Sequence, residues 1–319
     1  MFQLKSINQL ICSQEELKDF YDCTLSIWAQ EDGRTMTFEN FAAVSKDIKR
    51  DTYIFDCYLL MKNEAAIGKL IFQTVQEHDD QDVTISIIEQ FIDDEVFSFL
   101  DKEITNSFFE RKSWLKTFQP KIREWAKGKG FKVANHFQYF EKQISCNQIS
   151  ELEAKGTFPS ELTLHHVLYP EGEFMEEYIA FMNTCFKEMI RENVRENLEM
   201  KKDHLTKWIE SCKRQQTRFK VIVLRNSDKK MVAMSFGLLT EPNPKIFRQH
   251  MTGVDKNYRG KGIGMAMKSL LYAQVLREYP SVRTVTTDCF TSNKPMFDIQ
   301  LKMGFQPTKL SDELVRELQ

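Results

Sequence analysis

The spacing of apolar and polar residues along the chain predicts strands and helices in a repeated order. Alternating or β-branched stretches are typical of strands, and apolar positions three and four residues apart are typical of helices. In the first half, strands are expected at 2–8, 52–61, 66–75, 83–91, 115–118 and 132–144, and helices at 13–29, 37–48 and from 121 to about 128. Ser13 and Glu16 have the spacing of a capping box at the first helix start.

The second half repeats this order. Strands are expected at 162–168, 218–224, 231–240, 245–254 and 282–290, and helices at 174–188, 193–214, 263–277 and from Asn293 to a stop at Gly304. Residues 145–160 lack a clear period and contain Gly and Pro, which favours a linker. The pattern predicts an α/β (α+β) fold of two tandem domains, 1–150 and 155–319. Each would be a mixed, mostly antiparallel sheet flanked by helices, and the two would be duplicates in element order.

Composition narrows the class of protein. The chain has 319 residues, 42% hydrophobic and 28% charged, with a formal net charge of −2. This balance is typical of a soluble globular protein and gives no global argument for nucleic acid or an acidic membrane surface. Seven scattered cysteines form no CxxC pair, which favours free thiols over a disulfide framework or a metal site. No apolar stretch reaches the roughly 18 residues that span a bilayer, so we expect a cytoplasmic protein.

A glycine-rich segment at 249–269, QHMTGVDKNYRGKGIGMAMKS, is the clearest chemical signal. Gly260, Gly262 and Gly264 alternate with charged and apolar residues at the point where a strand gives way to a helix. Glycines allow close backbone approach, and the first turn of a helix offers unpaired N–H groups at a positive dipole end. A phosphate or pyrophosphate is therefore the expected ligand, with a loop that binds nothing as the alternative.

Other nucleotide-binding motifs fit this segment less well. The glycine spacing is GxGxG and differs from the GxGxxG of dinucleotide-binding folds, which would also open the domain. No Lys-Ser/Thr pair directly follows the last glycine, as a phosphate-binding P-loop requires, since three residues separate Gly264 from Lys268-Ser269.

The stretch TGVDKNYRGKGIG resembles the acyl-CoA signature of the GNAT N-acetyltransferase superfamily, R/Q-x-x-G-x-G/A. Arg259, Gly262 and Gly264 fill the signature. Downstream, TDCFTSNKPMFDIQLKMGF is similar to the family's second motif, with an Asn before a helix that ends in Gly304-Phe305. The two motifs cover about 60 residues, and the element order extends the resemblance over 155–310. The tandem arrangement resembles proteins of the mycothiol synthase type.

The resemblance implies acetyl-CoA as the co-substrate and a primary amine of a small molecule as the acceptor. It implies that backbone groups of the strand bind the pantetheine arm and that the helix start binds the pyrophosphate. From their charge alone, Arg259, Lys261 and Lys268 are expected to add positive potential at this helix start. The implied cofactor-binding residues are Thr252, Gly253, Val254, Arg259, Gly260, Lys261, Gly262, Ile263, Gly264 and Asn293. No nucleic acid, membrane or metal ion is expected as a partner.

Amide formation needs a base for the ammonium proton and an acid for the thiolate. Strand alternation predicts that Arg248, His250 and Thr252 share one face, and family members place Glu or His there, so His250 is the candidate base. A structural role for His250 is the alternative, and Glu241 and Asp288 are the other candidate bases. The family's usual acid, a Tyr seven residues after the Asn, corresponds here to Gln300, which cannot donate a proton.

The first half lacks the corresponding glycines. Residues Asp93, Asp94 and Glu95 stand after its strand at 83–91 and would repel a pyrophosphate. We therefore expect residues 1–150 to be a degenerate GNAT-like domain and 155–319 to be the catalytic domain. The expected activity is N-acetyl transfer by direct attack in a ternary complex. The alternative, motivated by Gln300, is a non-catalytic acyl-CoA-binding sensor or scaffold.

Overall fold

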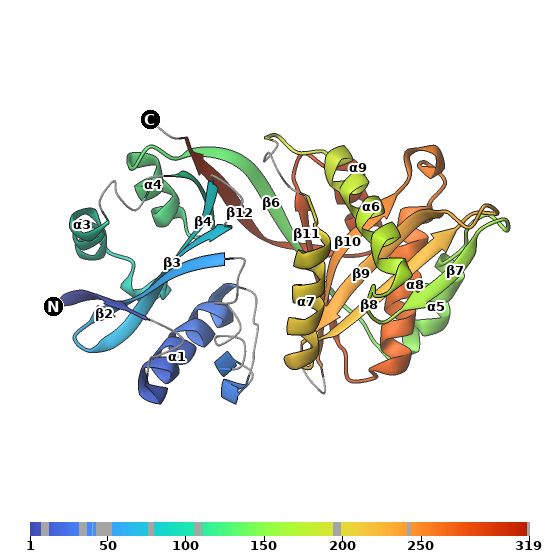
Figure 1. The fold of residues 1–319 in the computed structure, drawn as a ribbon. Coiled ribbons are helices and arrows are strands. Elements are labelled where there is room, and N and C mark those ends of the chain that lie inside the picture. Colours follow the sequence, from blue (N-terminus) through green and yellow to red (C-terminus); the bar gives the residue numbers. More distant parts are fainter. Residues whose placement is uncertain are drawn as a thin grey trace. The chain divides into compact units, whose positions relative to one another are not determined.

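The structure is a computed structural model that describes residues 1–7, 13–31, 37–39, 41–42, 53–75, 80–104, 109, 111–193, 199–240 and 244–317 (Figure 1). The chain forms two compact units. The first contains Met1–His136 and Leu310–Gln319, and the second contains Phe137–Lys309. The division differs from the expected 1–150 and 155–319, because it runs through two strands and not through a linker.

The first unit is an antiparallel sheet with one parallel strand pair among the pairs described. Its elements are β1 (Phe2–Ser6), α1 (Gln14–Glu31), β2 (Tyr53–Lys62), β3 (Ala65–Val75), β4 (Asp80–Ile87), η1 (Glu89–Phe91), α3 (Asp94–Glu103), β5 (Lys112–Thr117) and α4 (Pro120–Gly128). The strand order is β1-β2-β3-β4-β5-β12, and β4 and β5 are the parallel pair. The predicted capping box is present at the start of α1, since Glu16 N–H donates to Ser13 Oγ (3.1 Å) and Ser13 N–H to Glu16 Oε2 (2.9 Å).

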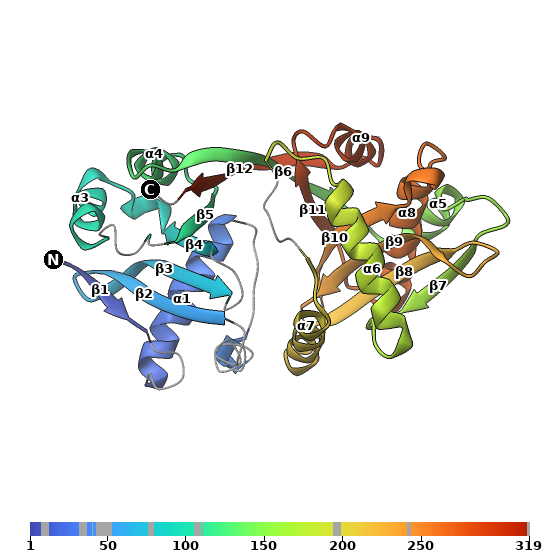
Figure 2. The ribbon, with the colours of Figure 1, turned by 45° about the horizontal axis from the view of Figure 1, so that its top comes forward.

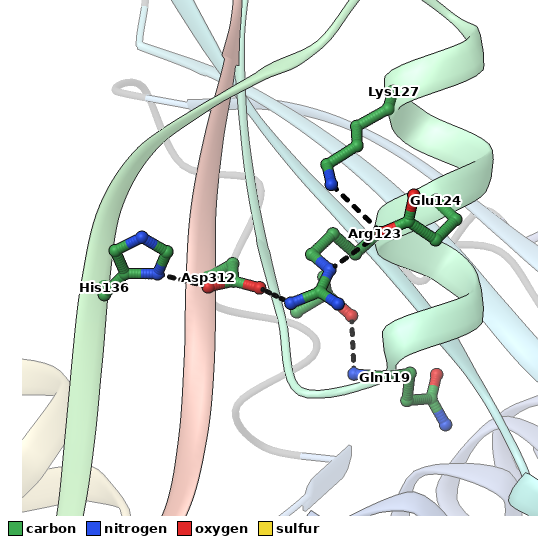
Figure 3. A network of polar contacts seen from close by, with 7 residues as sticks. Gln119, Arg123, Glu124, Lys127, His136 and Asp312 are labelled. Carbon is green, nitrogen blue, oxygen red and sulfur yellow. Dashed lines mark hydrogen bonds and ion pairs between the residues drawn. The ribbon is translucent and has the colours of Figure 1, made fainter.

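The last strand of the chain, β12 (Gln306–Arg316), was not expected from the sequence. Its residues Asp312–Arg316 pair antiparallel with β5 and complete the sheet of the first unit. Figure 3 shows Asp312 between Arg123 of α4 and His136 of β6 (Lys132–Gln143). Arg123 Nη1 donates to Asp312 Oδ2 at 2.8 Å, and His136 Nδ1 lies 2.6 Å from Oδ1. These contacts fix the strand to the helix and to its neighbouring strand.

The second unit has the order β6-β11-β10-β9-β8-β7. Its remaining elements are η3 (Cys146–Gln148), α5 (Ile149–Lys155), β7 (Thr163–Val167), α6 (Glu173–Glu188), α7 (Lys202–Arg214), β8 (Arg218–Arg225), β9 (Met231–Leu239), β10 (Ile246–Val254), η4 (Lys256–Tyr258), α8 (Ile263–Glu278), β11 (Thr284–Phe290) and α9 (Lys294–Lys302). Among the pairs described in this unit, β10 and β11 are parallel and the others antiparallel.

The sheet of the second unit is covered on both faces. One core contains Phe247, Leu271 and Val285 and lies between the sheet and α8. The other contains Phe219 and Phe236 and lies between the sheet and the pair α6 and α7. Figure 2 shows α6 and α7 on one face of this sheet and α8 on the opposite face. Residues of β10 therefore point alternately toward two different helix layers.

The expected linker at 145–160 is wrong in the structure. Ser145 and Gln148 form a capping box, and α5 follows with Leu152 buried. The helix packs against α8, where a Cβ atom on Gly156 would lie 2.4 Å from a Leu270 methyl carbon. The segment belongs to the core of the second unit because its short apolar face has a partner there.

Other boundaries also differ from the predicted ones. The strand expected at 83–91 ends at Ile87, because 89–91 form the 3₁₀ helix η1. The helix expected at 193–214 is described only from Lys202, with Lys201 as its N-cap. Most of the helix expected at 37–48 lies outside the described residues.

Candidate functional site

The site begins where β10 and β11 diverge. Residues Ile246–Arg248 of β10 pair in parallel with Thr284–Thr286 of β11. Beyond Arg248, the described pairs of β10 are with β9 alone, and those of β11 beyond Thr286 are with β6 alone. The edge of β10 that faces β11 therefore offers backbone N–H and C=O groups without a strand partner, and such groups can bind an extended ligand.

A cavity of about 640 Å³ lies at this fork. It is formed by the outer end of β10, the start of α8, one side of α9 along its length and the C-terminal end of α6. Its lining residues are Cys185, Glu188, Met189, Ile190, Met251, Thr252, Gly253, Val254, Tyr258, Arg259, Gly260, Gly262, Ile263, Gly264, Met265, Asn293, Pro295, Met296, Ile299 and Lys302. Most of the predicted cofactor-binding residues therefore line one cavity; Lys261 is not among the lining residues.

Two of the motif's glycines have left-handed backbone. Gly260 and Gly262 both have φ of +76°, and a Cβ atom on either would meet nothing within 4 Å. Their need for glycine is thus conformational and does not come from packing. Gly262 is the N-cap of α8, and residues 262–265 at the start of this 16-residue helix line the cavity, where the first N–H groups have no intrahelical acceptor.

The other two glycines of this region differ in how closely their neighbours pack. A Cβ atom on Gly253 would lie 2.3 Å from Cys185 Sγ, so α6 packs directly on the outer end of β10. A Cβ atom on Gly264 would lie 3.4 Å from Ile299 Cδ1 of α9, which is an ordinary van der Waals contact. Close approach of two elements therefore requires glycine at Gly253 but not at Gly264.

The charge at the cavity is mixed. Arg259 donates from Nε to the Val254 carbonyl oxygen at 2.9 Å and forms an ion pair with Glu188. Lys302 also lines the cavity, and Lys261 lies over the ring of Tyr258 at 5.3 Å from its centroid. The expected contribution of Lys268 to this charge is wrong, because that side chain is completely buried and does not line the cavity.

Asn293 lies at the second helix start that faces the cavity. Its Oδ1 accepts a hydrogen bond from Met296 N–H at 3.4 Å, which makes Asn293 the N-cap of α9. Asn293 also lines the cavity. Two helix N-termini, those of α8 and α9, therefore border the same space.

His250 lies in a β-bulge. The register of β10 with β9 shifts between Gln249 and Met251, so His250 is the extra residue. Its ring stacks on that of Phe236, with 5.7 Å between the ring centroids and an interplanar angle of 3°. It also contacts the ring of Trp208 edge-on, with 6.2 Å between the centroids. His250 is exposed on the face of the sheet that carries α6 and α7.

The bulge overturns the prediction that Arg248, His250 and Thr252 share one face. Thr252 Oγ1 accepts from Gln249 Nε2 at 3.0 Å, and Gln249 is bonded to residues of α8. Thr252 therefore faces the α8 side, whereas His250 faces the α6 side. One inserted residue inverts the alternation of the strand.

A buried polar network behind the fork was missed by the sequence analysis. Gln249 Oε1 accepts from Lys268 Nζ, from Tyr272 Oη at 3.3 Å and from Thr287 Oγ1 at 3.3 Å. Burial lowers the pKa of the Lys268 ammonium from 10.5 to about 7. One sequence feature could have revealed this network: Lys268 lies between Met267 and Leu271, on the apolar face of the helix predicted at 263–277.

The remaining candidates are placed as follows. Glu241 lies outside the described residues. Asp288 is on β11, half-buried, and does not line the cavity. Gln300 is buried and does not line the cavity either; within the described part of the chain its Oε1 has no hydrogen-bond partner.

The corresponding fork of the first unit is closed by its own side chains. There, the described pairing of β4 with β5 joins Asp80–Val83 to Lys112–Leu115 and goes no further. Gln119 then bonds both backbone groups of Ile87, with Nε2 donating to the carbonyl at 2.5 Å and Oε1 accepting from N–H at 3.3 Å. The start of α3 is capped by Asp93, whose Oδ1 accepts from Val96 N–H at 2.9 Å. A side-chain amide and a carboxylate thus occupy the groups that are open in the second unit.

Comparison with solved structures identifies the fold. A tandem GNAT protein from the clavulanic acid biosynthesis pathway is similar over 100% of this chain and 99% of its own, with a TM-score of 0.74 and 14% identity. A GCN5-related N-acetyltransferase from Sphaerobacter thermophilus is similar over 100% of this chain and 96% of its own, with a TM-score of 0.65 and 10% identity. No protein-family sequence model matches the chain, and no curated protein matches it in sequence.

The chain is thus a protein with the fold of the GCN5-related N-acetyltransferases, in the tandem form of the first of these structures. The resemblance expected from the glycine motif is confirmed at the level of the fold. Among the described helices, none is long and apolar enough to cross a membrane. The described residues contain no cluster of three or more His, Cys, Asp or Glu side chains suited to a metal ion.

Proposed function

We propose that the protein transfers an acetyl group from acetyl-CoA to a primary amine of a small molecule, by direct attack in a ternary complex. The observation that carries this proposal is the fork of β10 and β11, which opens onto a cavity bordered by the start of α8. An extended thioester arm needs such an unpaired strand edge, and a pyrophosphate needs such a helix start. The fold of the second unit supports the same activity.

The residues present fit a CoA molecule. The first N–H groups of α8, with the left-handed Gly260 and Gly262, offer donors to a pyrophosphate, and Arg259 supplies charge after leaving Glu188. Thr252 to Val254 offer backbone groups to the pantetheine arm, and Asn293 borders the same space. The space of about 640 Å³ is within the range of ligand pockets.

Bound acetyl-CoA supplies a thioester carbonyl that an amine nitrogen can attack, with cleavage of the carbon–sulfur bond. His250 is the proposed base that takes the proton released by the amine, directly or through water. The bulge holds its ring on Phe236, next to the cavity residue Met251. Asp288 and Glu241 are the alternative bases. A protein N–H at the fork would polarise the carbonyl, and water would protonate the thiolate, since Gln300 cannot donate a proton.

The two units would then divide the work. The second unit, Phe137–Lys309, would bind acetyl-CoA and carry out the transfer. The first would be a degenerate copy without a cofactor site, because Gln119 and Asp93 bond the groups that a cofactor would need. We place the protein in the cytoplasm, where acetyl-CoA and reduced cysteines are both expected.

The alternative function is a non-catalytic acyl-CoA-binding sensor or scaffold. The observation that favours it is the burial of Gln300, at the position where the family resemblance implies a catalytic Tyr. The two functions share the CoA site and differ in turnover.

Calorimetry with acetyl-CoA, followed by an assay of free thiol release with a panel of small primary amines, tests both functions. Micromolar binding with amine-dependent thiol release is expected. Binding without thiol release at any amine would support the sensor, and absence of both heat and thermal stabilisation would contradict both functions.

A further inference from the structure

We propose that Lys268 is a positioning residue of the acyl-transfer site, which through Gln249 orients the Thr252 hydroxyl at the fork of β10 and β11. The inference rests on the proposed function of this fork. Nothing in the family motifs places Lys268 here, since it lies one turn after Gly264 and away from the cavity. Three structural features support the role.

The first feature is the place of Gln249. Arg248 and Thr286 are the last paired residues of the two strands, so Gln249 and Thr287 are the first residues of the fork. Their side chains meet where their backbones no longer pair, with Thr287 Oγ1 donating to Gln249 Oε1 at 3.3 Å. Gln249 therefore joins the two strands at the point of divergence.

The second feature is the direction of the hydrogen bonds. The Oε1 atom of Gln249 accepts from Lys268, Tyr272 and Thr287, which fixes the amide so that Nε2 points the other way. Nε2 donates to Thr252 Oγ1 at 3.0 Å, and Thr252 lines the cavity. Thr252 Oγ1 also lies 2.8 Å from Ser235 Oγ. When Ser235 donates, both lone pairs of Thr252 are used, and its own proton is left to donate to a ligand in the cavity.

The third feature is the unfavourable free energy of burying the Lys268 side chain. Its side chain is fully buried, with Nζ 5.8 Å from the centroid of Phe305 and 6.0 Å from that of Tyr272. The titratable groups that act on it are Asp288 and Cys289 of β11, and burial outweighs both, so its pKa falls to about 7. Both the ammonium and the amine can donate to Gln249. An apolar side chain would suit this position better for folding.

The hydrogen bond from Lys268 thus selects one of the two possible orientations of the Gln249 amide, as outer hydrogen-bond partners orient many ligand-binding side chains. A reversed Gln249 amide would place Oε1 against Thr252 and force the Thr252 proton toward Gln249. The hydroxyl would then have no hydrogen bond to donate to the thioester. The expected defect is in the chemical step and not in cofactor binding.

The decisive variant is Lys268→Met, which keeps the length of the side chain without a donor. Ser269→Ala is the matched control, since Ser269 is buried on the same helix and its Oγ has no partner among the described residues. We expect Lys268→Met to bind acetyl-CoA within twofold of the wild type and to lose at least tenfold in kcat with little change in KM. Ser269→Ala should match the wild type in both.

A double-mutant cycle separates positioning from a general structural effect. Thr252→Val removes the oriented hydroxyl and should lower kcat to a similar extent. If Lys268 acts through Thr252, the double variant is no slower than Thr252→Val alone. Multiplicative losses in kcat would overturn the proposed chain from Lys268 to Thr252.

Gln249→Glu keeps the proposal testable if Lys268→Met fails to fold. The carboxylate retains the size of the amide and the partner for Lys268, but it cannot donate to Thr252, so the same loss of kcat is expected. A folded Lys268→Met or Gln249→Glu variant with wild-type kcat overturns the inference and leaves the proposed function intact. Wild-type protein that does not bind acetyl-CoA, or binds it without thiol release, overturns the transferase function as well.

Discussion

A Cβ atom on Gly253 would lie 2.3 Å from the Sγ atom of Cys185. The helix α6 therefore contacts the strand β10 at the one residue type that leaves room for a cysteine sulfur. Both residues line the cavity. Burial raises the pKa of the Cys185 thiol to about 12, which keeps the sulfur protonated at neutral pH.

Gly253→Ala should destabilise the protein by about 1–3 kcal/mol through overpacking and weaken acetyl-CoA binding. The clash is with Sγ alone, since Cys185 Cβ would lie at 3.4 Å. The double variant Gly253→Ala/Cys185→Ala should therefore regain most of the loss, as measured by denaturant unfolding. Gly128→Ala, at a helix end with open space, is the control and should not destabilise. Failure of Cys185→Ala to rescue would contradict the assigned contact.

Gly262→Val should abolish acetyl-CoA binding. A left-handed residue with a side chain costs about 1–2 kcal/mol, and the new atoms occupy the helix start that faces the cavity. Gly304→Val is the matched control, because Gly304 has φ of +82° with open space around it and does not line the cavity. Calorimetry should show lost binding for Gly262→Val only; equal losses in both variants would point to strain alone.

His250→Phe tests the proposed base without removing the ring stacked on Phe236. We expect turnover at neutral pH to fall by about 10²–10⁴, the usual contribution of a general base, while acetyl-CoA binding is unchanged. Asp288→Asn and Glu241→Gln are measured alongside. A larger loss in either of these, with His250→Phe active, would transfer the role of base to that carboxylate.

Arg259→Ala should weaken acetyl-CoA binding by about tenfold and reduce its salt dependence, because one charge-assisted contact is lost. Glu188→Gln should bind acetyl-CoA as tightly as the wild type or a few times more tightly, since Arg259 no longer leaves an ion pair. The ion pair is half-exposed and adds little to stability. Weaker binding in Glu188→Gln would show that Glu188 itself contacts the ligand.

Lys268 predicts an unusual dependence of stability on pH. Its folded pKa of about 7 lies below the ordinary 10.5, so the unfolded chain binds one more proton between these values. The loss of folding stability caused by the buried Lys268 is complete below pH 7 and disappears as the pH rises toward 10.5. Relative to Lys268→Met, the wild type should gain roughly 1 kcal/mol per pH unit over this window. A pH-independent difference between the two unfolding curves would refute the buried ammonium.

Several features of this protein were predictable from sequence because they depend on neighbours in the chain. The capping box at Ser13, the N-cap at Asn293 and the helix stop at Gly304 each follow from the conformational preference of one or two residues. The strand–glycine–helix order at 246–278 follows from apolar spacing. Together with the family resemblance, these local signals were enough to predict the tandem GNAT-like fold and nine of the residues that line the cavity.

Features that depend on pairing between distant segments were missed or misjudged. Strand β12 joins the sheet of the first unit from the far end of the chain, and α5 folds onto α8 where a linker was expected. The bulge at His250 inverts which side chains of β10 share a face, because a single unpaired residue shifts the register. No preference of an isolated segment encodes these outcomes.

By itself, the sequence determined most of the elements, their order and the glycine motif, since backbone preference and apolar period act within a few residues. Only the tertiary structure decided where β10 and β11 part, that Lys268 faces the core and that Gln119 closes the first fork. Each of these depends on which strand edge is left without a partner and which side chain reaches it. Packing across the sheet determines both, so the chemistry of the site depends on contacts between residues far apart in the chain.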